Sequence, residues 1–140
     1  MQPPKIKTHK MNAPYGQHHF FLLSKGYIAG KPLEKPCPNC FTVMTESETD
    51  KGKLFWVCYS LWKAGRYVPF LVGSVIPFLH IRDLKQEITS AIDLLNGKPR
   101  EFEKLVNNLQ TLHRLERQLE LQAKLITRTK GELVCAFLRR

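Results

Sequence analysis

The segment LVGSVIPFLHIRDL, residues 71–84, separates two parts of the chain that follow different sequence patterns. It is mostly apolar, and a Gly-Ser pair and Pro77 interrupt the apolar run. This composition predicts a strand over Val75–Ile81. Because proline cannot donate a ladder hydrogen bond, Pro77 restricts that strand to a sheet edge or a bulge. The segment is therefore expected to end a mixed domain and to lead into helices.

Two helices are predicted after this segment. Asp83, with Gln86 three residues later, has the spacing of an N-cap and its capping box, and Asn96-Gly97 is expected to end the helix that follows. Pro99 opens a second helix, which should extend to about residue 129. A helix of about 30 residues is roughly 45 Å long, so we expect it to pair with helix 83–95 near its start and with a partner helix further along.

The second helix carries an apolar residue at every seventh position, which is typical of a helix that packs against another helix. We predict that this stripe forms a homodimer or docks onto a larger protein. Its residues are Leu105, Leu112, Leu119 and Ile126, with Leu133 beyond them.

Upstream, the patterns predict two strands, His18–Ser24 and Cys40–Thr45, joined by a loop, and then a helix over Leu54–Ala64 that ends at Gly65. We therefore expect an α+β fold, with a small mixed sheet and helices followed by a helical hairpin that has one long coiled-coil-like helix. The expected organisation is a flexible basic arm (1–17), a mixed domain (18–82) and a helical arm packed partly on it (83–140).

The chain is strongly basic, with 22 Lys and Arg against 12 Asp and Glu, a net charge of +10. Most of the excess lies in residues 1–82. A field of this sign attracts polyanions and favours nucleic acid, and the alternative interpretation is that the charge serves only solubility. Basic and aromatic residues alternate along this part of the chain. The candidate surface residues for DNA contact are Lys25, Tyr27, Lys31, Lys63, Arg66, Tyr67 and Arg82.

Cys37 and Cys40 form a C-P-N-C motif, which is typical of zinc knuckles. A tetrahedral site needs two more ligands, and Cys58 and Cys135 do not have a matching spacing. Buried structural cysteines are the favoured interpretation, with a zinc site or a redox dithiol as alternatives. We expect no cofactor. No nucleophile has a visible base in the sequence, so we do not expect an enzyme.

The N-terminal residues lack the apolar core of a signal peptide. The longest apolar run, Tyr67–His80, is shorter than the roughly 20 residues that a membrane-spanning helix needs. We therefore expect a cytoplasmic protein that does not contact a membrane.

Residues 54–84 resemble the C-terminal half of a target-recognition domain in the DNA specificity subunits of type I restriction–modification systems. The matching motif comprises Gly73, Ser74, Pro77, Leu79, Asp83 and Leu84. The chain is long enough for one recognition domain and one spacer helix, which suggests a half-unit or a short uncharacterised bacterial family with the same fold. The resemblance implies non-catalytic recognition of double-stranded DNA, with the long helix used for dimerisation or docking. A protein–protein adaptor and a small zinc-knuckle protein are the alternative functions.

Overall fold

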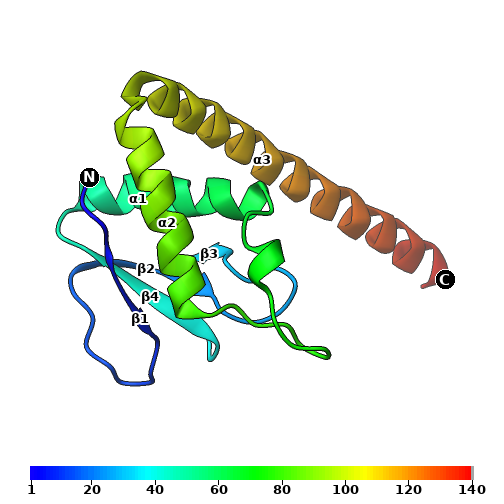
Figure 1. Cartoon of the computed structure of the whole chain (residues 1–140). Coiled ribbons are helices and arrows are strands. Elements are labelled where there is room, and N and C mark those ends of the chain that lie inside the picture. Colours follow the sequence, from blue (N-terminus) through cyan, green and yellow to red (C-terminus); the bar gives the residue numbers. More distant parts are fainter. Residues whose placement is uncertain (140) are drawn as a thin grey trace. The chain divides into compact units, whose positions relative to one another are not determined.

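The computed structural model describes residues 1–139 and confirms the α+β fold (Figure 1). The elements are β1 (Lys5–Thr8), β2 (His18–Leu23), β3 (Pro32–Leu33), β4 (Cys40–Thr45), α1 (Glu48–Lys63), the 3-10 turn η1 (Val68–Phe70), α2 (Ile81–Asn96) and α3 (Pro99–Leu138). The chain divides into two compact units, residues 1–98 and the residues from Pro99 onward. The sequence predicts a boundary after residue 82 instead. The difference arises because α2 buries Leu84 and Ile88 in the core of the first unit.

The first unit contains an antiparallel sheet with strand order β1-β4-β2-β3. In its register Phe20 lies opposite Val43, and Leu22 lies opposite Phe41. Since side chains alternate across a strand, these residues share one face of the sheet and are all buried. These four residues belong to the hydrophobic core cluster, so they form the face of the sheet that meets the helices.

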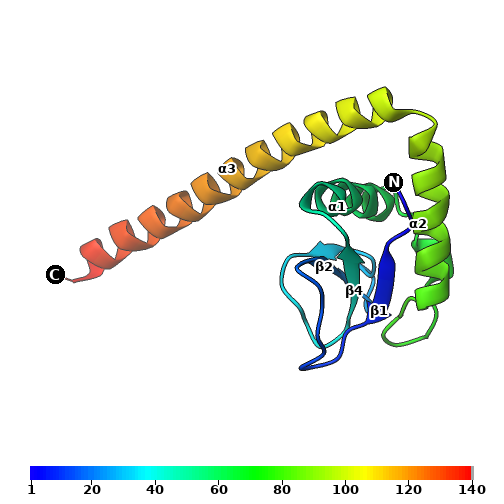
Figure 2. The ribbon, with the colours of Figure 1, turned by 90° about the vertical axis from the view of Figure 1, so that its left-hand side faces the viewer.

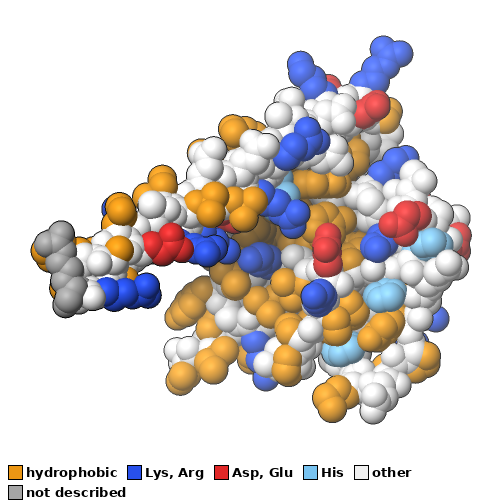
Figure 3. Space-filling view, turned by 180° about the vertical axis from the view of Figure 1, so that it is seen from behind, with side chains coloured by type: hydrophobic (Ala, Val, Ile, Leu, Met, Phe, Trp, Pro, Cys, Tyr) orange, Lys and Arg blue, Asp and Glu red, His pale blue; other side chains and the backbone are white. Residues whose placement is uncertain are grey.

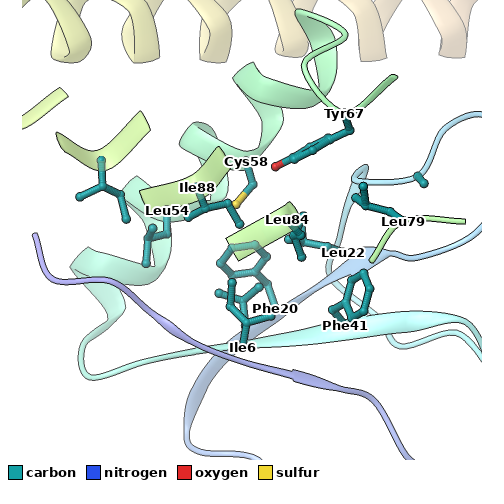
Figure 4. Close-up of a cluster of buried hydrophobic side chains, with 13 residues drawn as sticks. Ile6, Phe20, Leu22, Phe41, Leu54, Cys58, Tyr67, Leu79, Leu84 and Ile88 are labelled. Carbon is teal, nitrogen blue, oxygen red and sulfur yellow. The ribbon is translucent and has the colours of Figure 1, made fainter. Parts of the chain in front are cut away.

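Both helices of the first unit lie on that apolar face of the sheet (Figure 2). Helix α1 contacts β2, β3 and β4, whereas α2 contacts β1 and α1. Figure 4 shows the resulting core, in which Leu54 and Cys58 of α1 and Leu84 and Ile88 of α2 meet the sheet residues. Burying each large aliphatic or aromatic side chain contributes about 1.5–3 kcal/mol, so this core is the main source of stability in the unit.

Helix α1 has well-defined ends. The Ser47 side chain accepts a hydrogen bond from the backbone N–H of Asp50 at 3.1 Å, which caps the N-terminus. At the other end Gly65 has φ +69, and the N–H groups of Gly65 and Arg66 donate to the carbonyls of Trp62 and Leu61. This is a Schellman motif, and it confirms the prediction that Gly65 ends the helix.

Three local predictions are wrong. Residues 5–8 form the ordered strand β1 rather than part of a flexible arm; the strand has one apolar residue, Ile6, so its pattern is weak. Val75–Ile81 is not a strand, because the chain folds back and Val72 and Phe78 bond to each other. Helix α2 begins at Ile81 with the extended residue His80 as its cap, which places Asp83 inside the first turn.

The second unit is the single helix α3, which has 40 residues and is therefore roughly 60 Å long. It begins at Pro99 as predicted, but it continues through Gly131 to Leu138. A helical glycine costs about 1 kcal/mol relative to alanine, and the good helix formers around Gly131 offset that cost. The predicted end of this helix near residue 129 is therefore wrong.

Candidate nucleic-acid interface

Lys31 and Lys63 converge on the ring of Trp62 at the C-terminal end of α1. The Lys63 Nζ lies 4.9 Å and the Lys31 Nζ 5.6 Å from the centre of this ring. Lys31 comes from the turn before β3, so the sheet and α1 together bring the two ammonium groups to one place. Both are attracted to the negative face of the indole, which holds flexible side chains near one position.

Neither of these lysines forms an ion pair within the described part of the chain. Lys63 is exposed and Lys31 is partly exposed, so both charges remain available to an anion. Two unneutralised ammonium groups beside a half-buried aromatic ring can bind a phosphate and contact the sugar next to it. We call Lys31, Lys63 and Trp62 the lysine–tryptophan cluster.

Arg66 follows α1 closely but is already paired. Its Nε and guanidinium Nη2 each lie 3.2 Å from the Oε2 of Glu87, a nearly buried carboxylate on α2. The pair joins the loop after α1 to α2 and supplies the charge that Glu87 needs in the core. Arg66 therefore has a structural contact of its own, and its charge is neutralised locally.

Tyr67 lies in the core, where only 2% of its surface is exposed. Figure 4 shows its hydroxyl directed into the core toward Cys58. The prediction that Tyr67 is a surface contact is therefore wrong, because the run after α1 turns its aromatic ring inward. Burial raises the pKa of Tyr67, and none of the described residues hydrogen-bonds to its hydroxyl.

Lys25 and Tyr27 lie in a loop beside the turned segment 72–78. Lys25 forms an isolated bridge with Phe78, and the Gly26 N–H donates to the Pro77 carbonyl at 2.7 Å. Tyr27 is 80% exposed at the tip of its loop. Arg82 is exposed in the first turn of α2. Of the predicted contact residues, Lys31 and Lys63 therefore belong to the lysine–tryptophan cluster, and Lys25, Tyr27 and Arg82 lie in or close after the two neighbouring loops.

The six residues of the family-like motif have mainly structural positions. Gly73 has φ +104, a conformation that side chains rarely adopt, and it allows the turn through Ser74. Pro77, Leu79 and Leu84 are buried, and the Leu79 N–H donates to the Ser24 carbonyl at 2.9 Å. Asp83 lies at the N-terminus of α2, where a negative charge is favourable.

The cysteines do not come together. The Cys40 thiol donates to the Cys37 carbonyl at 3.1 Å, Cys58 is buried in the core, and Cys135 is exposed on α3. Burial raises the pKa of both Cys40 and Cys58, which keeps these thiols neutral. Within residues 1–139 there is no group of three or more His, Cys, Asp or Glu side chains placed to hold a metal ion.

The sequence patterns do not predict two surface features of the first unit. On the sheet face away from the helices, Tyr15 packs between His19 and Phe21, with ring centres 4.5 and 5.6 Å away, and His9 joins this aromatic cluster. The only sequence signal for this aromatic cluster is the strand predicted over HHFFLL. Side chains alternate between the two faces of a strand, so His19 and Phe21 lie on the same side. The second feature is the exposed tip of loop 72–78.

A groove of about 450 Å³ lies between β2 and the start of α1. At its edge the His18 Nδ1 lies 2.9 Å from Glu48 Oε2. This hydrogen bond, with Lys51 nearby, lowers the pKa of Glu48. The lining also includes Glu34, so the groove mixes both signs of charge and is a poorer phosphate site than the lysine–tryptophan cluster.

The stripe on α3 is exposed to solvent. Its residues Leu105, Leu112, Leu119 and Ile126 are all exposed, the last three by 58–61%, and apolar side chains are visible along the helix in Figure 3. None of the described residues of α3 is buried. No helix within residues 1–139 is both long and apolar enough to cross a bilayer. Exposed apolar residues at heptad spacing are characteristic of a helix that associates with another helix.

These features define a small α+β protein with a basic globular unit and a long helix that carries an exposed apolar stripe. The chain belongs to a family of unknown function, DUF6943, whose model matches residues 6–136. Searches of curated proteins and of solved structures gave no match.

Proposed function

We propose that this protein is a non-catalytic DNA-binding module and that α3 joins two copies of it. The observation that carries the proposal is the lysine–tryptophan cluster, in which two unpaired ammonium groups from separate segments meet at one aromatic ring. The net charge of +10 and the resemblance to restriction–modification specificity subunits also support it.

The cluster is suited to the DNA backbone. Lysine contacts phosphates as a point charge, so Lys31 and Lys63 would position the protein on a duplex without selecting a sequence. Arg82 is exposed in the first turn of α2 and is a further candidate for a contact with the DNA backbone, since arginine pairs readily with phosphate.

The test is the salt dependence of binding to a fluorescent duplex, followed by anisotropy. Each phosphate contact contributes about −0.9 to the slope of log K against log salt. K31Q/K63Q removes two such contacts, so the slope should become less negative by about 2. The control K5Q/K10Q also removes two positive charges. Lys5 lies in β1 and Lys10 just after it, and β1 is the sheet edge opposite β3.

The control should keep the wild-type slope. Failure of the wild-type protein to bind any duplex at low salt would rule out the function. Equal losses in both double variants would show that only the net charge matters, and would rule out the cluster as the interface.

Exposure of the α3 stripe favours a second candidate function, a protein–protein adaptor that acts through this helix. L112E/L119E places two charges in the stripe and should abolish self-association in sedimentation velocity. Q110E/Q118E adds the same charge outside the stripe and should leave self-association intact. A wild-type protein that sediments as a monomer would contradict the dimer, and capture of a different protein through the stripe would favour the adaptor.

A further inference from the structure

The loop 72–78 presents two aliphatic side chains to solvent. Val75 is 84% exposed and Ile76 is 64% exposed, although both are among the most apolar residue types. In Figure 1 this green loop between η1 and α2 extends away from the sheet and helices of the first unit. Tyr27 and Ile28, in the neighbouring loop, are also exposed. Exposed apolar side chains that lie next to one another are characteristic of a surface that contacts a partner.

The tip is held in place by backbone hydrogen bonds. The Val72 N–H donates to the Phe78 carbonyl at 3.0 Å, and the Phe78 N–H donates back at 2.8 Å. Gly26 anchors the loop to its neighbour through Pro77, and Gly73 provides the positive φ that the turn needs. The loop therefore presents its apolar tip without a large ordering cost on binding.

The surroundings of the tip carry positive charge. Lys25 is bridged to Phe78 at the base of the loop, and Arg82 follows it in α2. Residues 18–33 and 64–82, which contain both loops, have no Asp or Glu, and the nearest acidic residue along the chain is Asp83 in the first turn of α2. An apolar tip with basic neighbours fits a polyanion that also offers an apolar surface.

We infer that Val75 and Ile76 form a wedge that enters the minor groove of DNA and partly unstacks one base step. Proteins that kink DNA insert aliphatic side chains or proline between base pairs, and lysine or arginine beside the wedge contacts the flanking phosphates. Pyrimidine–purine steps such as TA unstack most easily, so they are the expected sites. The inference rests on the proposed DNA-binding function, and it adds bending to that function.

The experiment measures bending by energy transfer between dyes at the two ends of a duplex that contains a central TA step. Binding of the wild-type protein should increase the transfer, because a kink brings the ends together. V75S/I76S should abolish the increase and weaken binding roughly tenfold, since it removes the apolar contact and keeps the lysines. Because both side chains are exposed, the variant should fold normally, which its circular dichroism will check.

The matched control is V68S/L94S, which removes two exposed aliphatic residues outside the loop. It should bind and bend DNA as the wild-type protein does. Wild-type binding without a change in transfer would overturn the wedge and leave the DNA-binding function intact, whereas no binding would remove both.

A second arm uses vesicles of phosphatidylserine and phosphatidylcholine. We expect no difference between V75S/I76S and the wild-type protein in this arm. If the variant loses vesicle binding but bends DNA normally, the tip contacts lipid, and the wedge is overturned.

Discussion

Replacing Gly30 with alanine tests how tightly the first unit is built around Tyr67. Gly30 has φ +92, and a Cβ atom at this position would overlap the Cδ2 and Cε2 atoms of the Tyr67 ring. The ring is buried and cannot move aside without displacing the core. G30A should therefore destabilise the unit through both backbone strain and steric overlap.

The two costs can be separated with G26A. Gly26 also has φ +92, but a Cβ atom there would have open space around it. The positive φ costs an alanine about 1–2 kcal/mol in either variant. Overpacking a core costs typically about 1–3 kcal/mol more, so G30A should lose about 2–5 kcal/mol in total. The difference between the variants is the energy of the contact with Tyr67.

The free energy of unfolding is measured from urea titrations followed by tryptophan fluorescence, since Trp56 and Trp62 both lie on α1. Equal slopes with urea for the three proteins will show that the variants unfold from comparable states. If G30A and G26A lose the same free energy, the close packing of Gly30 on Tyr67 is wrong.

Three further predictions concern the core and the thiols. Y67F should raise the free energy of unfolding by up to about 1 kcal/mol in the same titrations, because it removes a buried hydroxyl with no hydrogen-bond partner among the described residues; a loss of 1 kcal/mol or more would show that the hydroxyl is bonded. R66A should cost about 1–2 kcal/mol, because it leaves the Glu87 carboxylate unpaired, and R66A/E87Q should recover most of this loss. At pH 8 a thiol reagent should react quickly with Cys37 and Cys135 alone. Cys40 and Cys58 should react only after unfolding, since burial raises the pKa of both thiols. Fast reaction at all four cysteines in the folded protein would contradict the buried core.

The elements with strong periodicity could be predicted from the sequence. Strands β2 and β4 are short runs in which consecutive residues are buried, and helices α1 and α2 carry apolar residues at the helical spacing of their buried faces. The weak cases depend on contacts between distant segments. β1 is a strand because β4 provides an edge for it to pair with, and loop 72–78 closes on itself because Gly73 permits a positive φ.

The candidate site could be predicted only in part, for the same reason. The order of residues along the chain shows that lysines and aromatic residues are interleaved. Which of them meet in space depends on the fold. Lys31 and Lys63 are far apart in the chain and meet at Trp62, whereas Arg66 meets Glu87. Tyr67 turns inward because Gly30 leaves space for its ring. A sequence pattern records residue types, and it does not record these pairings.

The proposed dimer and the proposed DNA contacts support each other energetically. One copy offers few phosphate contacts at the lysine–tryptophan cluster, and a few such contacts give weak binding at physiological salt. If α3 joins two copies, the second copy binds at the high effective concentration that the first one sets, which can raise the overall affinity by about 10²–10⁴ without any new contact. L112E/L119E should therefore weaken DNA binding while leaving the lysines in place. K31Q/K63Q should weaken DNA binding and leave association through α3 unchanged, so the two surfaces can be separated by measurement.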